Sequence, residues 1–365
     1  MKKIMLTTAM VSVLSTAAIA QTSVTGQLRI SYTDISADKG VGTATATTTK
    51  DTSYGFGSEQ QLNISNKGKL PVFGLDYAAG FSIENDGIQT TTLFNENVYI
   101  DLIKASSGTT ISFGQDHIQR SDTDNSATNL VGFSPNELSQ TSASSNANTR
   151  FKQNIGAAPG QHFGAAVLQK TPFGTFSYNY APNISSGAGQ TDASVSTSET
   201  VNPNTTGAYE IGFVGDLGVK GLTIHAFKNK ADDFISASSE VRAEAKNYGV
   251  KYNFGQVTVG INKKVHQEET TRDLVNTTTA GTGTSEHTEK AMALAYAVNK
   301  DLTIGLLYAK AEQAAETVDQ KVKAINIGYA LGPIAVDVGY AKNDDLNGVV
   351  GAGANHFKAR MITNF

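Results

Sequence analysis

The chain ends in the stretch NHFKARMITNF, residues 355–365, in which apolar and polar side chains alternate. Phe357, Met361 and Phe365 lie on one face of a strand with this sequence, and Lys358 and Arg360 lie on the other. Chain termini fray unless neighbouring elements hold them. An alternating strand at the C-terminus therefore predicts a partner strand elsewhere in the chain.

Alternating segments of the same kind recur along the whole sequence. Residues 24–32, VTGQLRISY, place Val24, Leu28 and Ile30 on one face and Arg29 on the other. Further alternating segments lie near residues 54–64, 75–83, 176–180, 209–213, 222–224, 248–254, 257–261, 292–298, 325–331 and 334–340. Their second faces are small and polar, and the 35 Gly, 13 Tyr and 16 Phe also favour strands and turns.

The connections between these segments alternate in length. Short turns are predicted near residues 66–70, 106–108, 171–173, 216–219, 254–255, 299–301 and 331–333, and long polar segments near 35–52, 85–92, 117–160, 182–205, 230–240, 267–287, 311–319 and 343–354. This rhythm gives sixteen antiparallel strands, with short turns at one rim and long loops at the other, the pattern of an outer-membrane barrel. Residues 150–155, RFKQNI, would also fit a further strand; we assign them to a loop, because an odd count would leave the termini on opposite sides.

The predicted fold class is therefore an all-β, sixteen-stranded antiparallel transmembrane β-barrel with short periplasmic turns and long extracellular loops. Its apolar faces would meet lipid and its polar faces would line a lumen. In a closed barrel the last strand pairs with the first, which supplies the partner for residues 355–365.

The first residues, MKKIMLTTAMVSVLSTAAIA, predict a secretory signal peptide over residues 1–20. Lys2 and Lys3 precede a short apolar run, and Ala18 and Ala20 form a small-residue cleavage site. The rest of the chain, residues 21–365, is predicted to be a single barrel domain. Removal of two lysines leaves 27 Lys plus Arg against 33 acidic residues, a formal charge of −6, which argues against a nucleic acid as partner.

Signals for catalysis, metals and cofactors are weak. The chain has no Cys, no G-x-S-x-G, no HExxH and no P-loop, and Ser112 with His117 is a poor candidate for a hydrolase pair. Asp122 and Asp124 resemble the start of an EF-hand loop, but position twelve is Phe133 instead of a carboxylate. We predict no enzyme activity, no cofactor and no metal ion, although an irregular divalent site at these two aspartates stays open.

The long segment 117–160 is the most informative loop. Four acidic residues lie in or next to it, and they are Asp116, Asp122, Asp124 and Glu137. One reading places the loop inside the lumen, anchored on the wall by Leu130, Val131 and Phe133. The other reading is an exposed loop with solvated acids. On the wall, alternation points Arg29, Lys358 and Arg360 inward, since a basic side chain near the bilayer midplane costs ~2–4 kcal/mol.

The sequence resembles the Gram-negative general porins of the trimeric, sixteen-stranded type. The residues that carry the resemblance are VTGQLRISY after the signal, SYGFGSEQQLNIS with FGLDYAAGFSIEND, NVYIDLIKASSGTTISFGQD before the long loop, and the terminal aromatic Phe365. The sequence departs from the family at Gln115, where a basic residue is common, and at Gln60, where an acidic one is. These departures concern pore selectivity.

The resemblance implies a homotrimer in the outer membrane, with lipid, lipopolysaccharide and the barrel-assembly machinery as partners. It also implies an inward-folded third loop, 117–160, whose acids face the basic wall across a narrow neck. The predicted function is a water-filled channel for passive diffusion of ions and small hydrophilic solutes, with weak cation selectivity. The alternatives are a solute-specific channel of the same fold, a plugged barrel with a structural or adhesive role, and a soluble β protein.

Overall fold

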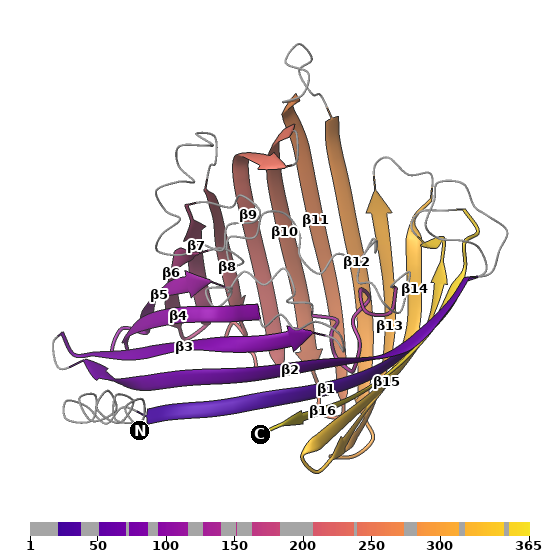
Figure 1. Cartoon of the computed structure of the whole chain (residues 1–365), viewed down its shortest axis with the longest axis horizontal. Helices are drawn as coiled ribbons and strands as arrows, with labels where there is room; N and C mark the ends of the chain where they lie inside the picture. The colour runs from indigo at the N-terminus through magenta and orange to yellow at the C-terminus, as the bar shows by residue number, and fades with distance from the viewer. Residues whose placement is uncertain are drawn as a thin grey trace, which may run out of the picture.

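The structure is a computed structural model that describes residues 21–37, 51–70, 73–86, 94–115, 127–139, 151, 163–182, 207–236, 239–273, 283–313, 318–346 and 350–365. This part of the chain forms one closed antiparallel barrel of sixteen strands (Figure 1). The strands are β1 (Gln21–Ala37), β2 (Asp51–Leu70), β3 (Leu75–Asp86), β4 (Phe94–Lys104), β5 (Thr109–Gln115), β6 (Gly164–Thr171), β7 (Gly174–Ala181), β8 (Ala208–Gly215), β9 (Leu222–Ser236), β10 (Ser239–Asn253), β11 (Val257–Asp273), β12 (Gly283–Ala297), β13 (Leu302–Gln313), β14 (Gln320–Leu331), β15 (Ile334–Asp344) and β16 (Ala354–Asn364). The predicted fold class is confirmed in strand number, direction and closure.

The C-terminal strand closes the barrel. β16 pairs with β1 from Gln27 opposite Asn364 to Ala37 opposite Ala354. Beyond this ladder, the backbones of Gly26 and Phe365 exchange hydrogen bonds of 2.8 and 3.0 Å. Closure satisfies every strand edge, which matters in lipid because an unpaired backbone group there costs several kcal/mol.

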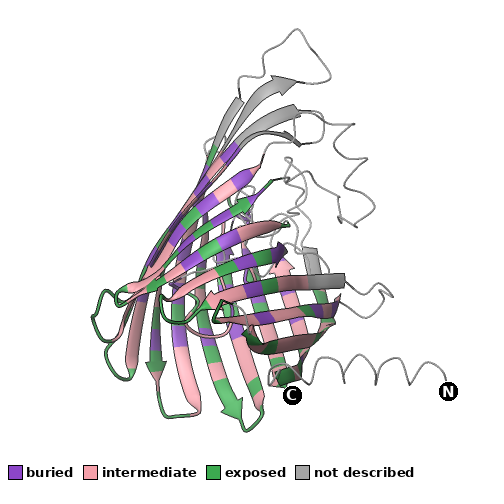
Figure 2. Ribbon diagram, turned by 90° about the vertical axis from the view of Figure 1, so that its left-hand side faces the viewer, coloured by how far each residue is buried: buried purple, intermediate pink, exposed green. Residues whose placement is uncertain are grey.

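The two faces of the strands have opposite polarity, as the alternation predicts. Large apolar residues such as Ile30, Phe56 and Leu306 are exposed on the outer surface, whereas Ser112 and Asn343 are buried on the inner face. Exposed and buried residues alternate along the strands in Figure 2. The barrel is therefore apolar outside and polar inside, the reverse of a soluble protein.

Several connections differ from the prediction. The first short turn is not at residues 66–70, because β2 continues to Leu70 and the chain reverses before Leu75 through positive φ angles at Phe73 and Gly74. Parts of the predicted loops 230–240 and 267–287 are strand, since β9 to β12 extend into them. Backbone pairing does not require apolar side chains, so polarity marks where a strand leaves the lipid and not where the strand ends.

Other predicted segments are described only in part. The predicted signal peptide, residues 1–20, lies outside the described residues. Phe151, from the segment considered as a seventeenth strand, is buried and belongs to no strand, and residues 152–155 lie outside the described part. Among the residues that the structure describes, no helix is long and apolar enough to cross a membrane.

Candidate functional site

The described part of the third loop, residues 127–139, lies against the inner wall formed by β11 to β16. The loop leaves β5 and returns to β6, yet its contacts are on the other side of the barrel. The backbone N–H of Ala127 donates to Asn262 of β11 at 3.3 Å. Side-chain amides of Asn326 on β14 and Asn343 on β15 donate to the carbonyls of Phe133 and Leu138 at 3.1 and 2.9 Å. These bonds hold the loop inside the barrel.

Glycines on the inner wall allow the loop backbone to approach closely. A Cβ atom at Gly260 of β11 would lie 1.9 Å from the carbonyl oxygen of Ala127, and one at Gly339 of β15 would lie 2.6 Å from the Phe133 ring. Both distances are shorter than van der Waals contact, so a larger residue at either position would displace the loop. The contact surface of the wall therefore depends on these two glycines.

Apolar side chains of the loop pack on the same wall. Phe133 and Leu138 are fully buried in a cluster with Phe151, Leu307 and Val322. Burial of two such side chains contributes roughly 2–3 kcal/mol each. The predicted anchor Phe133 therefore lies in an apolar cluster.

The other predicted anchors differ in their surroundings. Val131 faces Gly305 of β13 and Gly328 of β14, whereas Leu130 is only partly buried. Sequence reasoning missed Leu138, although an isolated Leu in so polar a loop was an available signal.

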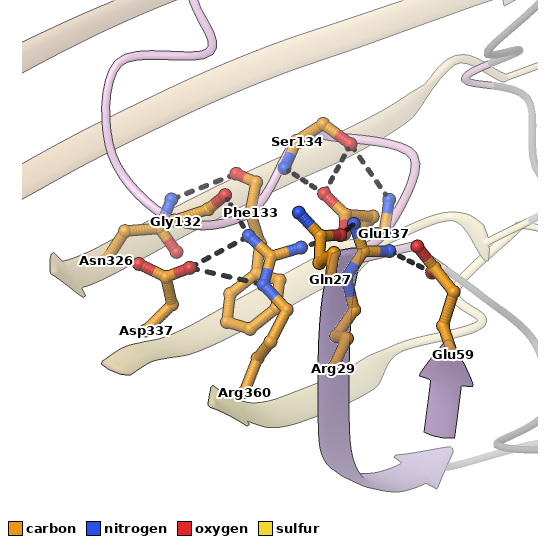
Figure 3. Close-up of polar contacts among 10 residues, drawn as sticks. All are labelled: Gln27, Arg29, Glu59, Gly132, Phe133, Ser134, Glu137, Asn326, Asp337 and Arg360. Atoms are coloured by element: carbon orange, nitrogen blue, oxygen red, sulfur yellow. Dashed lines mark hydrogen bonds and ion pairs between the residues drawn. The ribbon is translucent and has the colours of Figure 1, made fainter. Parts of the chain in front are cut away.

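Arg360 on β16 links the loop to the wall (Figure 3). Its Nε and Nη2 atoms donate to Oδ2 of Asp337 on β15 at 3.1 and 2.9 Å, and its Nη1 donates to Oε1 of Glu137 in the loop at 2.9 Å. Nη2 also donates to the carbonyl of Gly132 at 2.9 Å, and the guanidinium lies 4.6 Å from the centroid of the Phe133 ring. One guanidinium therefore serves two carboxylates, a loop carbonyl and a ring.

The other two residues of the predicted basic wall differ from Arg360. Arg29 on β1 forms an ion pair with Glu59 on β2, its direct cross-strand partner. The Nζ atom of Lys358 lies 5.5 Å from the Phe133 ring centroid, and Lys358 forms no ion pair within the described residues. Around Phe133 and Arg360, three cations therefore face three carboxylates, namely Glu59, Glu137 and Asp337.

This geometry differs from the predicted neck of separated acidic and basic walls. Glu137 does not stand across the lumen from Arg360 but is bonded to it, because a guanidinium held at a wall with little solvent is stabilised by direct contact with a carboxylate. Asp116, Asp122 and Asp124, the other predicted acids, lie outside the described residues. Asp337 and Glu59 were not predicted as site residues, since their pairing depends on strand register.

The charged residues around Phe133 and Arg360 form a cluster that binds and positions charge. No group in this charged cluster is placed for covalent chemistry. Ser112, the serine considered for hydrolysis, donates to Asp101 at 2.5 Å, and His117 lies outside the described residues. Within the described part of the chain, no three His, Asp or Glu residues are arranged to hold a metal ion. The arrangement suits a passage for charged or polar solutes.

Residues 7–361 match the family model for Gram-negative porins. The chain belongs to this family. The porin lies in the outer membrane and forms a channel through which solutes diffuse, and its family and fold point to a channel without enzymatic chemistry. No curated protein sequence matches it.

Solved outer-membrane proteins share the fold of this porin at low sequence identity. The anion-selective porin from Comamonas acidovorans is 11% identical, with a TM-score of 0.65, and the match covers 95% of this chain and 100% of that one. OmpT of Vibrio cholerae is 13% identical, with a TM-score of 0.62 and coverage of 95% and 98%. A triple mutant of the Rh. blastica porin is 14% identical, with a TM-score of 0.55 and coverage of 94% and 100%. At these identities the likeness concerns the fold alone.

Proposed function

We propose that this porin is a water-filled channel for passive diffusion of ions and small hydrophilic solutes, narrowed by the third loop, residues 117–160. The observation that carries the proposal is the Glu137–Arg360–Asp337 contact, which ties the loop to the inner wall of a closed barrel. A loop held against one side of the wall narrows the lumen and leaves the rest of its cross-section open.

The proposed role of Arg360 is to hold the loop in place, and that of Asp337 is to offset its charge. Both carboxylates on Arg360 reduce the positive charge that a permeating ion meets, so Lys358 is the cation of the basic wall that acts on solutes most directly. The acidic side of the neck is proposed at Asp116, Asp122 and Asp124. With the cluster near neutrality and the mature chain at −6, weak cation selectivity follows.

The inner face favours a general channel over a solute-specific one. Inward positions such as Ser82, Ser112 and Asn229 are small and polar, whereas a solute-specific track would require a line of aromatic or arginine side chains. We propose accordingly that no covalent step and no cofactor take part. The alternative is a plugged barrel with a structural or adhesive role, and measurements of conductance distinguish it from an open channel.

Assembly and export complete the proposal. We infer that residues 1–20 are removed after Ala20 and that the barrel-assembly machinery recognises Phe365. We also infer that three copies of the chain associate in the outer membrane, in contact with lipid and lipopolysaccharide. Support for the trimer comes from a solved OmpT of Vibrio cholerae described as a trimer form, which is 13% identical with a TM-score of 0.60 and coverage of 95% and 99%.

Single-channel recording of the detergent-extracted protein in a planar bilayer with a KCl gradient tests this function. Stepwise ohmic openings, commonly in threes, are the expected result, and the sign of the reversal potential gives the ion preference. Absence of conductance from a folded barrel would overturn the channel and favour the plugged barrel.

A further inference from the structure

Within the residues that the structure describes, the outer surface of the barrel carries three clusters in which one carboxylate bridges two lysines; we call them lysine triads. In one triad, Glu312 on β13 lies 2.8 Å from Nζ of Lys290 on β12 and 3.0 Å from Nζ of Lys310 on its own strand. The other two have the same form, with distances of 2.9 and 3.8 Å in one and 2.9 and 2.6 Å in the other. They consist of Lys323, Asp344 and Lys342 on β14 and β15, and of Lys228, Glu244 and Lys246 on β9 and β10.

Each triad is built on two lysines that are direct cross-strand partners. The pairs are Lys290 opposite Lys310, Lys323 opposite Lys342, and Lys228 opposite Lys246. Like charges directly opposite one another destabilise a sheet. Since one carboxylate serves two ammonium groups, the three residues of a triad carry a net charge of +1. In the triad of Glu312, Asp319 pairs with Lys310 at 2.7 Å and balances this charge; in the other two triads an additional anion would relieve the repulsion.

The triads share one order along their strands. β13 carries Tyr308, Lys310 and Glu312 at steps of two residues, and β15 carries Tyr340, Lys342 and Asp344. β10 runs in the opposite direction and has the reverse order, Glu244, Lys246 and Tyr248. Tyrosine therefore always lies nearer the short turns, and the carboxylate always lies nearer the long loops.

This order places the lysines at a definite depth. Tyrosines on the outer face of a membrane barrel mark the boundary between hydrocarbon and headgroups. Two residues of a strand span about 7 Å. The paired lysines of each triad thus lie one such step beyond the tyrosines, at the level of lipid headgroups.

Neighbouring lysines connect the triads into a continuous group on the outer surface, which we call the lysine belt. Lys263 on β11 and Lys321 on β14 lie opposite Lys290 and Lys310 in the strand register. Two further carboxylates lie in the same region: Asp319 lies 2.7 Å from Nζ of Lys310, and Glu286 accepts a hydrogen bond from Gln267. The belt therefore has excess lysine on a chain whose formal net charge is −4.

We propose that the lysine triads bind the phosphate groups of anionic lipid in the leaflet on the long-loop side. An ammonium group binds phosphate as a point charge, and two opposed ammonium groups can receive one phosphate between them. Because these lysines continue from strand to strand across β9 to β15, they would hold several headgroups against this part of the barrel. The inference rests on the proposed lipid contact of the porin and gives it specific residues.

Native mass spectrometry of the full-length mature protein in detergent, titrated with lipid A that carries both phosphates, tests the proposal. The variant replaces four triad lysines with glutamine: Lys290, Lys310, Lys323 and Lys342. A matched control replaces four exposed lysines at the short-turn side: Lys104, Lys170, Lys220 and Lys300. We expect the triad variant to bind at least about tenfold more weakly and the control to bind as the wild type does, since each lysine near an anionic surface adds to the attraction and the control lysines lie at the opposite rim.

A second variant tests the same surface with the opposite sign. Glu244→Gln, Glu312→Gln and Asp344→Asn together remove the bridging carboxylates, so lipid A binding should tighten. Conductance in a planar bilayer checks that each variant forms the channel, which separates failure of this inference from failure of the proposed function. Unchanged binding by the lysine variant, an equal loss in the control, or equal binding of lipid A without phosphates would overturn the proposal.

Discussion

Asp337→Asn is expected to shift the channel toward anions. Asp337 offsets the charge of Arg360 through contacts of 3.1 and 2.9 Å to one carboxylate oxygen. Asparagine keeps an oxygen acceptor of the same size at this position, so the guanidinium and the loop stay in place. Only the charge changes: Arg360 then has Glu137 as its single carboxylate, and the surrounding cluster gains one positive charge.

The size of the shift follows from the place of Arg360 on the inner wall, where 12% of its side chain is exposed. A permeating ion about 6 Å away in water would gain or lose about 0.7 kcal/mol from one unit charge. Screening at an ionic strength of about 0.1 M, with a Debye length of about 10 Å, reduces this to about 0.4 kcal/mol. Each ion concentration then changes about twofold in opposite directions, so the anion-to-cation permeability ratio rises about fourfold.

The assay is the reversal potential in a KCl gradient for the wild type and two variants. Asp301→Asn, in the short turn between β12 and β13, removes the same charge far from the cluster and should leave the ratio unchanged. A wild-type ratio in Asp337→Asn, or a shift toward cations, would refute the idea that Asp337 offsets a charge seen by permeating ions. A strong increase at low salt and a weak one at high salt would identify the effect as electrostatic.

Three further predictions follow from the closure of the barrel, the docking of its loop and its export. Gly260→Val should displace the loop from β11, and so raise the conductance and the rate of liposome swelling in larger neutral sugars. Gly55→Val, at a glycine with open space around it, should change neither quantity. Equal behaviour of the two variants would contradict the docking of the loop on β11. Deletion of Phe365 removes two backbone hydrogen bonds to Gly26 and should lower the free energy of unfolding in detergent by about 2 kcal/mol; an unchanged denaturation curve would count against it. Mass spectrometry of the protein from outer membranes should find Gln21 as the first residue, and retention of residues 1–20 would rule out the predicted cleavage.

The candidate site was only partly predictable from the sequence. Alternation alone indicates that Arg29, Lys358 and Arg360 point inward, because side chains on a strand change face at every residue. The sequence does not indicate which carboxylates pair with these residues. Asp337 meets Arg360 because β15 and β16 pair in one register, and a shift by one residue would turn Asp337 to the outer face.

The third loop shows the same limit. Its length and its apolar residues Leu130, Val131 and Phe133 made an anchored loop one of two interpretations, but the contacts of Glu137, Leu138 and Ala127 depend on the opposite wall. Two glycines of that wall, Gly260 and Gly339, are far from the loop in sequence, and only the closed barrel brings them to it. Hence the bonding of Glu137 to Arg360, in place of separation across the lumen, was not visible in the sequence.

The sequence by itself determined the class of fold, the number of strands and the face on which each strand residue lies. These properties are local, since they follow from a period of two and from the spacing of turns. The tertiary structure decided which charges meet, where the loop rests and how the lysines of neighbouring strands combine on the outer surface. Those outcomes depend on strand register and barrel closure, which join residues that are hundreds of positions apart, as Arg360 and Glu137 are.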